Sequence, residues 1–212
     1  MIFKDRIEAG KSLAEKLTAL QIKPPLIVLG LPRGGVIVAH EIAQKLKAPL
    51  DIIVPRKIGA PFSPELAIGA ITEDGSLLLN QELMKSLQIK QDYIETESAK
   101  EKKEAQRRLN KYRAGRASLD LKDKTVIITD DGIATGATMQ AALRSIRSQN
   151  AKKIIVAVPV LPPDTKAIIE KECDELVFLG QPADFGAIGM FYEKFDQTTD
   201  EEVIRLMKKY LV

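Results

Sequence analysis

The sequence is poor in aromatic residues: tryptophan is absent, and aromatics make up 5% of the chain, so the core must be mainly aliphatic. The single cysteine, Cys173, excludes a disulfide within the chain and favours a reducing compartment. No apolar run is long enough to span a membrane. The first residues show no charged start followed by an apolar run, so no secretory signal is predicted. We therefore expect a cytoplasmic protein with no membrane partner.

Positive and negative residues nearly balance, so there is little excess charge of either sign. The formal net charge is +3, which is too small by itself to indicate a nucleic-acid binder. Hydrophobic residues make up 45% and charged residues 29% of the chain, which is ordinary for a globular protein. A length of 212 residues suffices for one domain with a sizeable core. We expect a single domain over residues 1–212.

Short apolar runs alternate with helical patterns along most of the chain. Residues 26–29 and 51–54 are predicted to be buried strands, and helical spacing runs between them from Val36 to Leu46. The pattern recurs, with strands expected at 125–129, 154–158 and 176–179, and helices at 136–149 and 165–171. Further helices are expected at 5–20 and 199–211. This alternation predicts a three-layer α/β/α sandwich with a mainly parallel sheet of about five strands.

Residues 57–116 break the alternation and are predicted to form an elaboration of this domain. Asp74-Gly75 between two apolar runs is a hairpin signal, and the hairpin should add an antiparallel edge. Residues 91–113 are rich in Lys, Arg, Glu and Gln, which predicts a long, mostly solvated helix. Its basic residues could form a nucleic-acid patch, but their alternation with glutamates favours a solvated face with ion pairs.

The densest functional signal is the string I-I-T-D-D-G-I-A-T-G-A-T at residues 127–138. A buried strand ends in two carboxylates, Asp130 and Asp131, and a loop of small residues leads at once into a helix. In open α/β sheets, ligands bind where strand C-termini meet helix N-termini, whose N–H groups suit a phosphate. The carboxylates could instead accept hydrogen bonds from a vicinal diol. Together they match a ribose 5-phosphate, and the alternative is a plain turn whose aspartates cap the helix.

Two other phosphate loops are excluded by spacing. A P-loop needs a lysine that does not occur between Gly132 and Thr138. The dinucleotide pattern G-x-G-x-x-G is present neither in this loop nor in residues 30–35.

The string resembles the signature with which type I phosphoribosyltransferases bind phosphoribosyl pyrophosphate (PRPP). By that resemblance, Asp130 and Asp131 are the ribose-hydroxyl ligands. The 5-phosphate would be held by Ala134, Thr135, Gly136, Ala137 and Thr138. In the 6-oxopurine enzymes of the family, the position of Ala134 holds an aspartate that acts as acid or base toward the purine. Because alanine cannot do this, hypoxanthine and guanine are less expected acceptors.

The resemblance also gives roles to two turns. The turn after the first strand would hold pyrophosphate through Pro32, Arg33, Gly34 and Gly35, unless it is an ordinary Gly-Gly turn. Arg56 and Lys57 follow the second strand and would stabilise the charge of the departing pyrophosphate, unless they are solvated surface cations. Residues 58–64, with one glycine and two prolines, are expected to be a flexible loop that closes over the site.

In this family the acceptor base is held by a segment called the hood, for which residues 180–195 are the candidate. Phe185 could stack on a planar ring, and Asp184 or a backbone group could read its edge. The alternative is that the aromatic residues of this segment fill the edge of the sheet. The only histidine, His40, and Cys173 are both expected to be structural.

Two hypotheses follow. In the first, the chain is a phosphoribosyltransferase that transfers ribose 5-phosphate from PRPP to a nitrogenous base and releases pyrophosphate. The resemblance then implies Mg²⁺ bound with PRPP, with no direct protein ligand predicted, and a homodimer. As a whole the chain is most similar to the group known as predicted phosphoribosyltransferases, whose acceptor the resemblance does not fix. In the second, it is a regulator that senses PRPP or a nucleotide without turnover, and some relatives of this kind act through nucleic acid.

Overall fold

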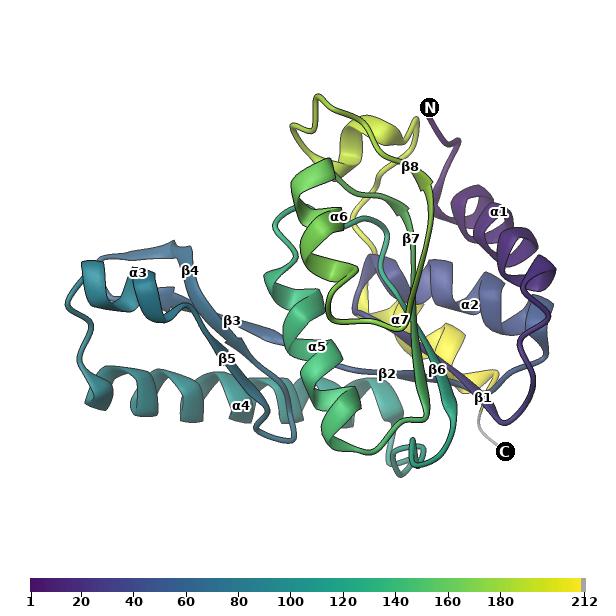
Figure 1. Ribbon diagram of the computed structural model, residues 1–212. Coiled ribbons are helices and arrows are strands. Elements are labelled where there is room, and N and C mark those ends of the chain that lie inside the picture. Colours follow the sequence, from purple (N-terminus) through teal and green to yellow (C-terminus); the bar gives the residue numbers. More distant parts are fainter. Residues whose placement is uncertain (211–212) are drawn as a thin grey trace.

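The computed structural model describes residues 1–210, apart from the side chain of Glu65. Its centre is a sheet of five parallel strands in the order β2-β1-β6-β7-β8 (Figure 1). The strands are β1 (Leu26–Gly30), β2 (Leu50–Ile52), β6 (Thr125–Thr129), β7 (Lys153–Val160) and β8 (Glu175–Gly180). The helices around it are α1 (Arg6–Ala19), α2 (Gly34–Leu46), α5 (Ala137–Ser148), α6 (Pro163–Ile169) and α7 (Asp200–Lys208). The arrangement is the predicted α/β/α sandwich.

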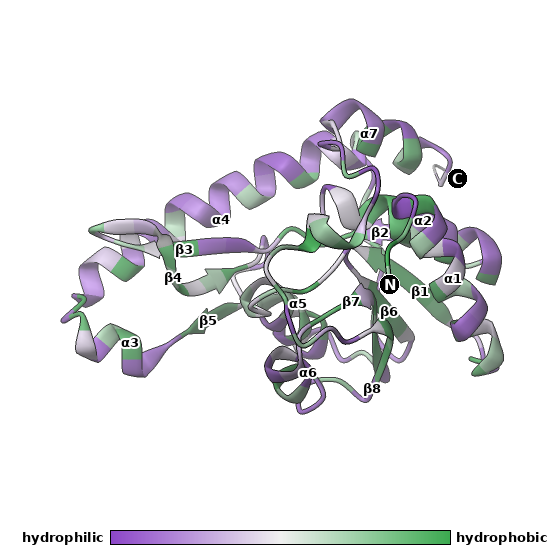
Figure 2. Cartoon of the chain, turned by 90° about the horizontal axis from the view of Figure 1, so that it is seen from above, coloured by the Kyte–Doolittle hydropathy of each residue, from purple (hydrophilic) through white to green (hydrophobic). Residues whose placement is uncertain are grey.

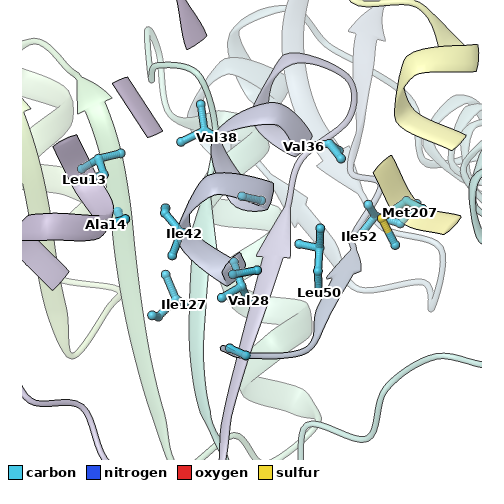
Figure 3. Packing of buried hydrophobic residues seen from close by; sticks show 14 of the residues in the cluster. Leu13, Ala14, Val28, Val36, Val38, Ile42, Leu50, Ile52, Ile127 and Met207 are labelled. Atoms are coloured by element: carbon cyan, nitrogen blue, oxygen red, sulfur yellow. The ribbon is translucent and has the colours of Figure 1, made fainter. Parts of the chain in front are cut away.

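Alternate residues of each central strand enter two different cores. In β6, Ile127 packs with α1, α2 and α7, whereas Val126 and Ile128 pack with α5 and α6. Figure 3 shows side chains of α1, α2 and α7 gathered with those of three strands in the first of these cores. A strand that is apolar on both faces needs a helical layer on each side, which explains the continuous apolar runs in the sequence.

A second, smaller sheet projects from the body in Figure 1. It is antiparallel, with the order β3-β4-β5. Its elements are β3 (Arg56–Ala60), β4 (Ser63–Ile71) and β5 (Leu77–Leu79), followed by α3 (Gln81–Ser86) and α4 (Gln91–Arg113). We call residues 56–113 the arm. The predicted hairpin is present as β4 and β5, and β3 pairs with it to complete a separate sheet.

Residues 58–64, expected to be a flexible loop, are mostly strand. Only the turn between Ala60 and Ser63 interrupts β3 and β4. Gly59 was expected to make a loop flexible. In the structure it lies in a strand, where a Cβ would collide with the carbonyl oxygen of Pro64. The glycine permits a close approach of two strands.

The long helix α4 has the predicted bounds and is polar along most of its surface (Figure 2). A narrow buried stripe recurs every three or four residues and joins two cores. Ile94 packs in the core of the arm, while Leu109 and Tyr112 pack in the core of the body. Ion pairs of the expected kind are present between Glu97 and Lys100 and between Glu104 and Arg108, each at 2.8 Å. The interpretation of this helix as a solvated face is therefore supported by its contacts.

The terminal helices begin at caps that the sequence supplies. Asp5 accepts a hydrogen bond from the Glu8 N–H at the start of α1, and Thr199 and Glu202 form a capping box at α7. The predicted end of the last helix at Leu211 lies outside the described residues. A short 3-10 helix, η1 (Ile188–Phe191), was not predicted. Within residues 1–210, no helix is both long and apolar enough to cross a bilayer.

Candidate active site

The two predicted ligand loops meet at the middle of the central sheet. β1 and β6 are neighbours, and their further partners, β2 and β7, lie on opposite sides. Where strand order reverses in this way, the loops at the carboxyl ends of the two strands diverge and leave a crevice. The loop after β1 holds Pro32 to Gly35, and the loop after β6 begins with Asp130. The fold therefore brings together two segments that are far apart in the sequence.

Asp131 is fixed by a buried ion pair with Arg6. The Nε atom of Arg6 lies 2.7 Å from Oδ2 of Asp131, and the two side chains are only 10% and 12% exposed. Arg6 also donates to the carbonyl oxygen of Asp196 at 2.8 Å, and its guanidinium lies 3.9 Å from the centre of the Phe195 ring. Removing the charge of one partner would leave the other buried without compensation.

Asp130 has a different environment from its neighbour. Its Oδ1 accepts a hydrogen bond from the Asp131 N–H at 2.8 Å. Burial, and then the adjacent Asp131 carboxylate, raise the pKa of Asp130 well above its ordinary value. A carboxyl group with a strongly perturbed pKa is typical of a functional site. Its ionised form would gain from a cation or a sugar hydroxyl.

The glycines after β1 allow the two loops to touch. A Cβ at Gly35 would lie 2.7 Å from the Cα of Asp130. A Cβ at Gly34 would collide with Oδ2 of Asp131 and would lie 2.7 Å from Nε of Arg6. Any larger residue at these positions would displace the acidic pair. The contacts place the predicted pyrophosphate turn directly against the predicted ribose ligands.

Arg33, in the same turn, faces the N-terminus of α7. Its Nη1 lies 3.7 Å from Oδ1 of Asp200. Asp200 also accepts hydrogen bonds from Lys111 and Tyr112 of α4, each at 2.7 Å. These hydrogen bonds and the positive charges nearby lower the pKa of Asp200 below its ordinary value. The Arg33 guanidinium thus makes a long contact with a carboxylate at the edge of the crevice.

The loop predicted to hold a phosphate ends at an exposed helix start. Gly136, the N-cap residue of α5, has a φ of +82°, and none of the described side chains caps the helix. Ala134, Thr135 and Thr138 are exposed. Thr165 of α6 contacts this loop, because its hydroxyl donates to the carbonyl oxygen of Ala134 at 2.5 Å. Unpaired N–H groups at such a helix start suit an anion.

Arg56 and Lys57 do not occupy equivalent positions. Arg56 forms a 2.7 Å ion pair with Glu101, a buried residue of α4. Lys57 is exposed and lines a cleft of about 710 Å³ together with Thr135 and Ala137. The structure thus brings Lys57 toward the phosphate loop and holds Arg56 against the arm helix.

The candidate hood covers the loop after β6. A Cβ at Gly132 would lie 2.7 Å from Cγ2 of Ile188, so η1 packs directly on that loop. The Phe185 ring lies 5.1 Å from that of Phe191, within a cluster at the edge of the sheet. Asp184 is exposed. These contacts agree with the alternative in which the aromatic residues fill the sheet edge.

The chain matches the family model described as phosphoribosyl transferase domain over residues 3–187. The protein belongs to the phosphoribosyl transferase family. A Mycobacterium tuberculosis protein whose name places it among the phosphoribosyl transferases is 44% identical over 208 residues, which are 98% of this chain and 47% of that protein. The chain therefore spans about half the length of the curated relatives it matches.

Two solved structures are also similar to this chain. TT1426 from Thermus thermophilus is 40% identical, with a TM-score of 0.86, and 99% of each chain is covered. A hypothetical protein from Neisseria gonorrhoeae with bound ppGpp is 14% identical, with a TM-score of 0.51, and the match covers 99% of this chain and 94% of that one. The second likeness shows a shared fold alone.

Three residues that contact the candidate site of this phosphoribosyl transferase were not predicted. They are Arg6, Thr165 and Tyr192, whose hydroxyl donates to the carbonyl oxygen of Asp131 at 2.6 Å. Burial raises the pKa of the Tyr192 phenol. One of the three carried a signal: Arg6 lies on the same helical face as Ala9, Leu13 and Leu17, and an arginine in an apolar stripe requires a buried partner.

Proposed function

We propose that the chain is a PRPP-dependent phosphoribosyltransferase that acts on a nitrogenous base and releases pyrophosphate. The observation that carries this proposal is the convergence of the acidic pair, the Gly34-Gly35 turn and the uncapped start of α5 at one crevice. The family membership supports a phosphoribosyl transfer reaction in general. Ala134 supports an acceptor other than a 6-oxopurine. The family resemblance also leads us to include a homodimer in the proposal.

Each group of residues would hold one part of PRPP. The 5-phosphate would accept hydrogen bonds from the backbone N–H groups of residues 134–138, and the ribose hydroxyls would donate to Asp130 and Asp131. Arg33 and its turn would face the pyrophosphate. The C1–O bond breaks, and pyrophosphate leaves with the electron pair. The lone pair of the acceptor nitrogen forms the C1–N bond, and the proton on that nitrogen passes to solvent. Positioning and fixed charges would supply most of the acceleration.

The carboxylates of Asp130 and Asp131 are the groups at this site that could bind Mg²⁺. Carboxylate oxygens suit this hard cation, which usually keeps several ligands from water and phosphate. Asp131 already pairs with Arg6, and the residues that the structure describes contain no group of three or more His, Cys, Asp or Glu able to hold a metal. We propose that Mg²⁺ is held mainly by PRPP, with Asp130 nearby, and that it neutralises charge on the pyrophosphate.

The decisive test is PRPP binding by calorimetry in the presence of Mg²⁺. The double variant Asp130→Asn with Asp131→Asn should abolish binding, because both acceptors for the ribose hydroxyls lose their charge. Asp123→Asn is a matched control, since Asp123 is exposed, precedes β6 at the opposite end of that strand, and has a φ of +58° that asparagine tolerates. Unchanged PRPP affinity in the double variant would refute the assignment.

Turnover is tested separately, by following pyrophosphate release with PRPP, Mg²⁺ and a panel of bases. One observation favours testing the sensor alternative alongside: Arg56, expected to stabilise the departing pyrophosphate, is paired with Glu101 in this structure. Thermal stabilisation by PRPP with no pyrophosphate release for any base would favour a sensor. Binding to RNA or DNA that weakens with salt would indicate a regulator that acts through nucleic acid.

A further inference from the structure

The cleft of about 710 Å³ that contains Lys57 lies between the arm and the phosphate loop. One wall comes from β4 and β5, and the other comes from the start of α5 and from Ile168 of α6. Thr135 and Ala137 line the cleft as well as belonging to the proposed phosphate cradle. The cleft therefore opens directly from the place where the 5-phosphate would be bound.

The cleft is lined mainly by apolar residues, with a few polar ones among them. Leu66 and Ile168 line it although each is 41% exposed, and Leu78 and Leu79 of β5 line it as well. The polar lining residues are Lys57, Asn80, Thr135 and Gln140. Ligand sites are commonly concave spaces of about 300–1,000 Å³ with apolar walls and a few placed polar groups. This composition suits a flat, partly polar ring system better than another protein surface.

The polar groups match a nucleotide. Asn80 caps α3 with its side-chain oxygen, which accepts from the Leu83 N–H at 3.0 Å, so its amide NH₂ group can still donate. The Gln140 amide can donate or accept at the edge of a base. Lys57 of β3 places a positive charge on the arm side of the cleft. A base between the leucine and isoleucine side chains would offer its polar edge to the Asn80 and Gln140 amides, with its phosphates toward the loop at 134–138.

The position of the cleft fixes which part of a ligand it can reach. Its described lining comes from the arm, the start of α5 and α6, and does not include the acidic pair or the hood. A ribose held by Asp130 and Asp131 would direct C1 toward the leaving pyrophosphate and the acceptor. Because Thr135 and Ala137 of the proposed phosphate cradle line the cleft, it lies on the 5-phosphate side of such a ribose. An acceptor base joined at C1 would therefore lie elsewhere, and the cleft suits a group attached to the phosphate.

We propose that this cleft binds a nucleoside joined through a pyrophosphate to the 5-position of the bound ribose. This inference rests on the proposed function, because the terminal ribose phosphate must occupy the PRPP site. The ligand class is a ribose 5-phosphate joined through a pyrophosphate to one nucleoside, of which ADP-ribose is the simplest probe. Its terminal ribose phosphate would bind in the loop at 134–138, and its adenosine would lie between Leu66 and Ile168.

The test compares ADP-ribose with ribose 5-phosphate by calorimetry on the parent protein and on two variants, Leu66→Gln and Ile168→Gln. Both side chains are partly exposed, so these variants should fold. Leu87→Gln is the control, since Leu87 is 38% exposed and is not among the described residues that line the cleft. We expect ADP-ribose to bind roughly tenfold more tightly than ribose 5-phosphate, and each cleft variant to remove most of that difference.

The two ligands separate failure of this inference from failure of the proposed function. Equal affinity for ADP-ribose and ribose 5-phosphate overturns the nucleoside site, and so does an equal loss for both ligands in the cleft variants. Absence of binding by PRPP and ribose 5-phosphate overturns the proposed function instead. A selective loss of ADP-ribose affinity in Leu66→Gln and Ile168→Gln, with Leu87→Gln unchanged, supports the inference.

Discussion

Arg6 and Asp131 lie where the first helix of the chain meets the loop after β6, and their side chains are 10% and 12% exposed. Replacing Arg6 with glutamine keeps a polar side chain but leaves the Asp131 carboxylate buried without a cation. Loss of one partner of a buried ion pair costs about 3–5 kcal/mol. The contact of the guanidinium with the Phe195 ring is lost as well. For a chain of this size, the cost corresponds to a fall of roughly 10 °C in Tm.

The assay is a double-mutant cycle in which urea unfolding is measured for Arg6→Gln, Asp131→Asn and the two combined. Because each single variant leaves one charge unpaired, the double variant should lose less stability than the sum of the two losses, by at least about 1 kcal/mol. Arg205→Gln is the control, since Arg205 is exposed on α7. Losses that add to within about 0.5 kcal/mol would refute the argument that the pair acts as a unit.

Two predictions concern titration. Since burial beside Asp131 raises the pKa of Asp130 above its ordinary 3.8, its ionised form is disfavoured in the folded state, and Asp130→Asn should raise the Tm of the ligand-free protein at neutral pH. The gain in Tm should vanish as the pH falls below about 4, where the Asp130 carboxyl is protonated in both the folded and the unfolded state. An Asp130→Asn variant that is less stable than the parent protein at neutral pH would contradict this prediction. For His40, burial and then Lys209 lower the pKa from 6.5 to about 4, so the free energy of unfolding should fall as the pH drops through this window, because the unfolded chain binds the proton first. His40→Gln should flatten that part of the pH profile in urea titrations, and an unchanged slope would assign the effect to other groups.

The parallel sheet, and the meeting of the two predicted ligand loops at one edge of it, could be predicted because each strand and each loop is a continuous stretch of sequence. Apolar runs that are buried on both faces define β1 and β6, and the residues that follow them form contiguous motifs. Topology then brings the motifs together without further information, since the carboxyl ends of adjacent parallel strands share one edge. The glycines that fit one loop against the other were also visible, although their contact partners were not.

Other parts of the site depend on single residues that are far apart in the chain. Arg6 is 125 residues from Asp131, and Thr165 is 31 residues from Ala134. No local pattern links such pairs. Strand β3 was missed for a different reason: glycine and proline near its end indicate a loop, but here the glycine serves the close packing of two strands. The position of the Arg56 side chain depends on its ion pair with Glu101. From the sequence, Glu101 was expected only to lie on a solvated helix, with no indication of this partner.

The helix α4 spans both cores, and this continuity has a mechanical consequence. Its first turns are embedded in the arm through Ile94, and its last turns are embedded in the body through Leu109 and Tyr112. An unbroken helix resists bending, because bending would stretch its backbone hydrogen bonds. Near its far end, Lys111 and Tyr112 hold Asp200, which in turn faces Arg33. One continuous helix therefore connects the core of the arm to the carboxylate that faces Arg33, so the arm and the pyrophosphate turn are linked through a single element and one side chain.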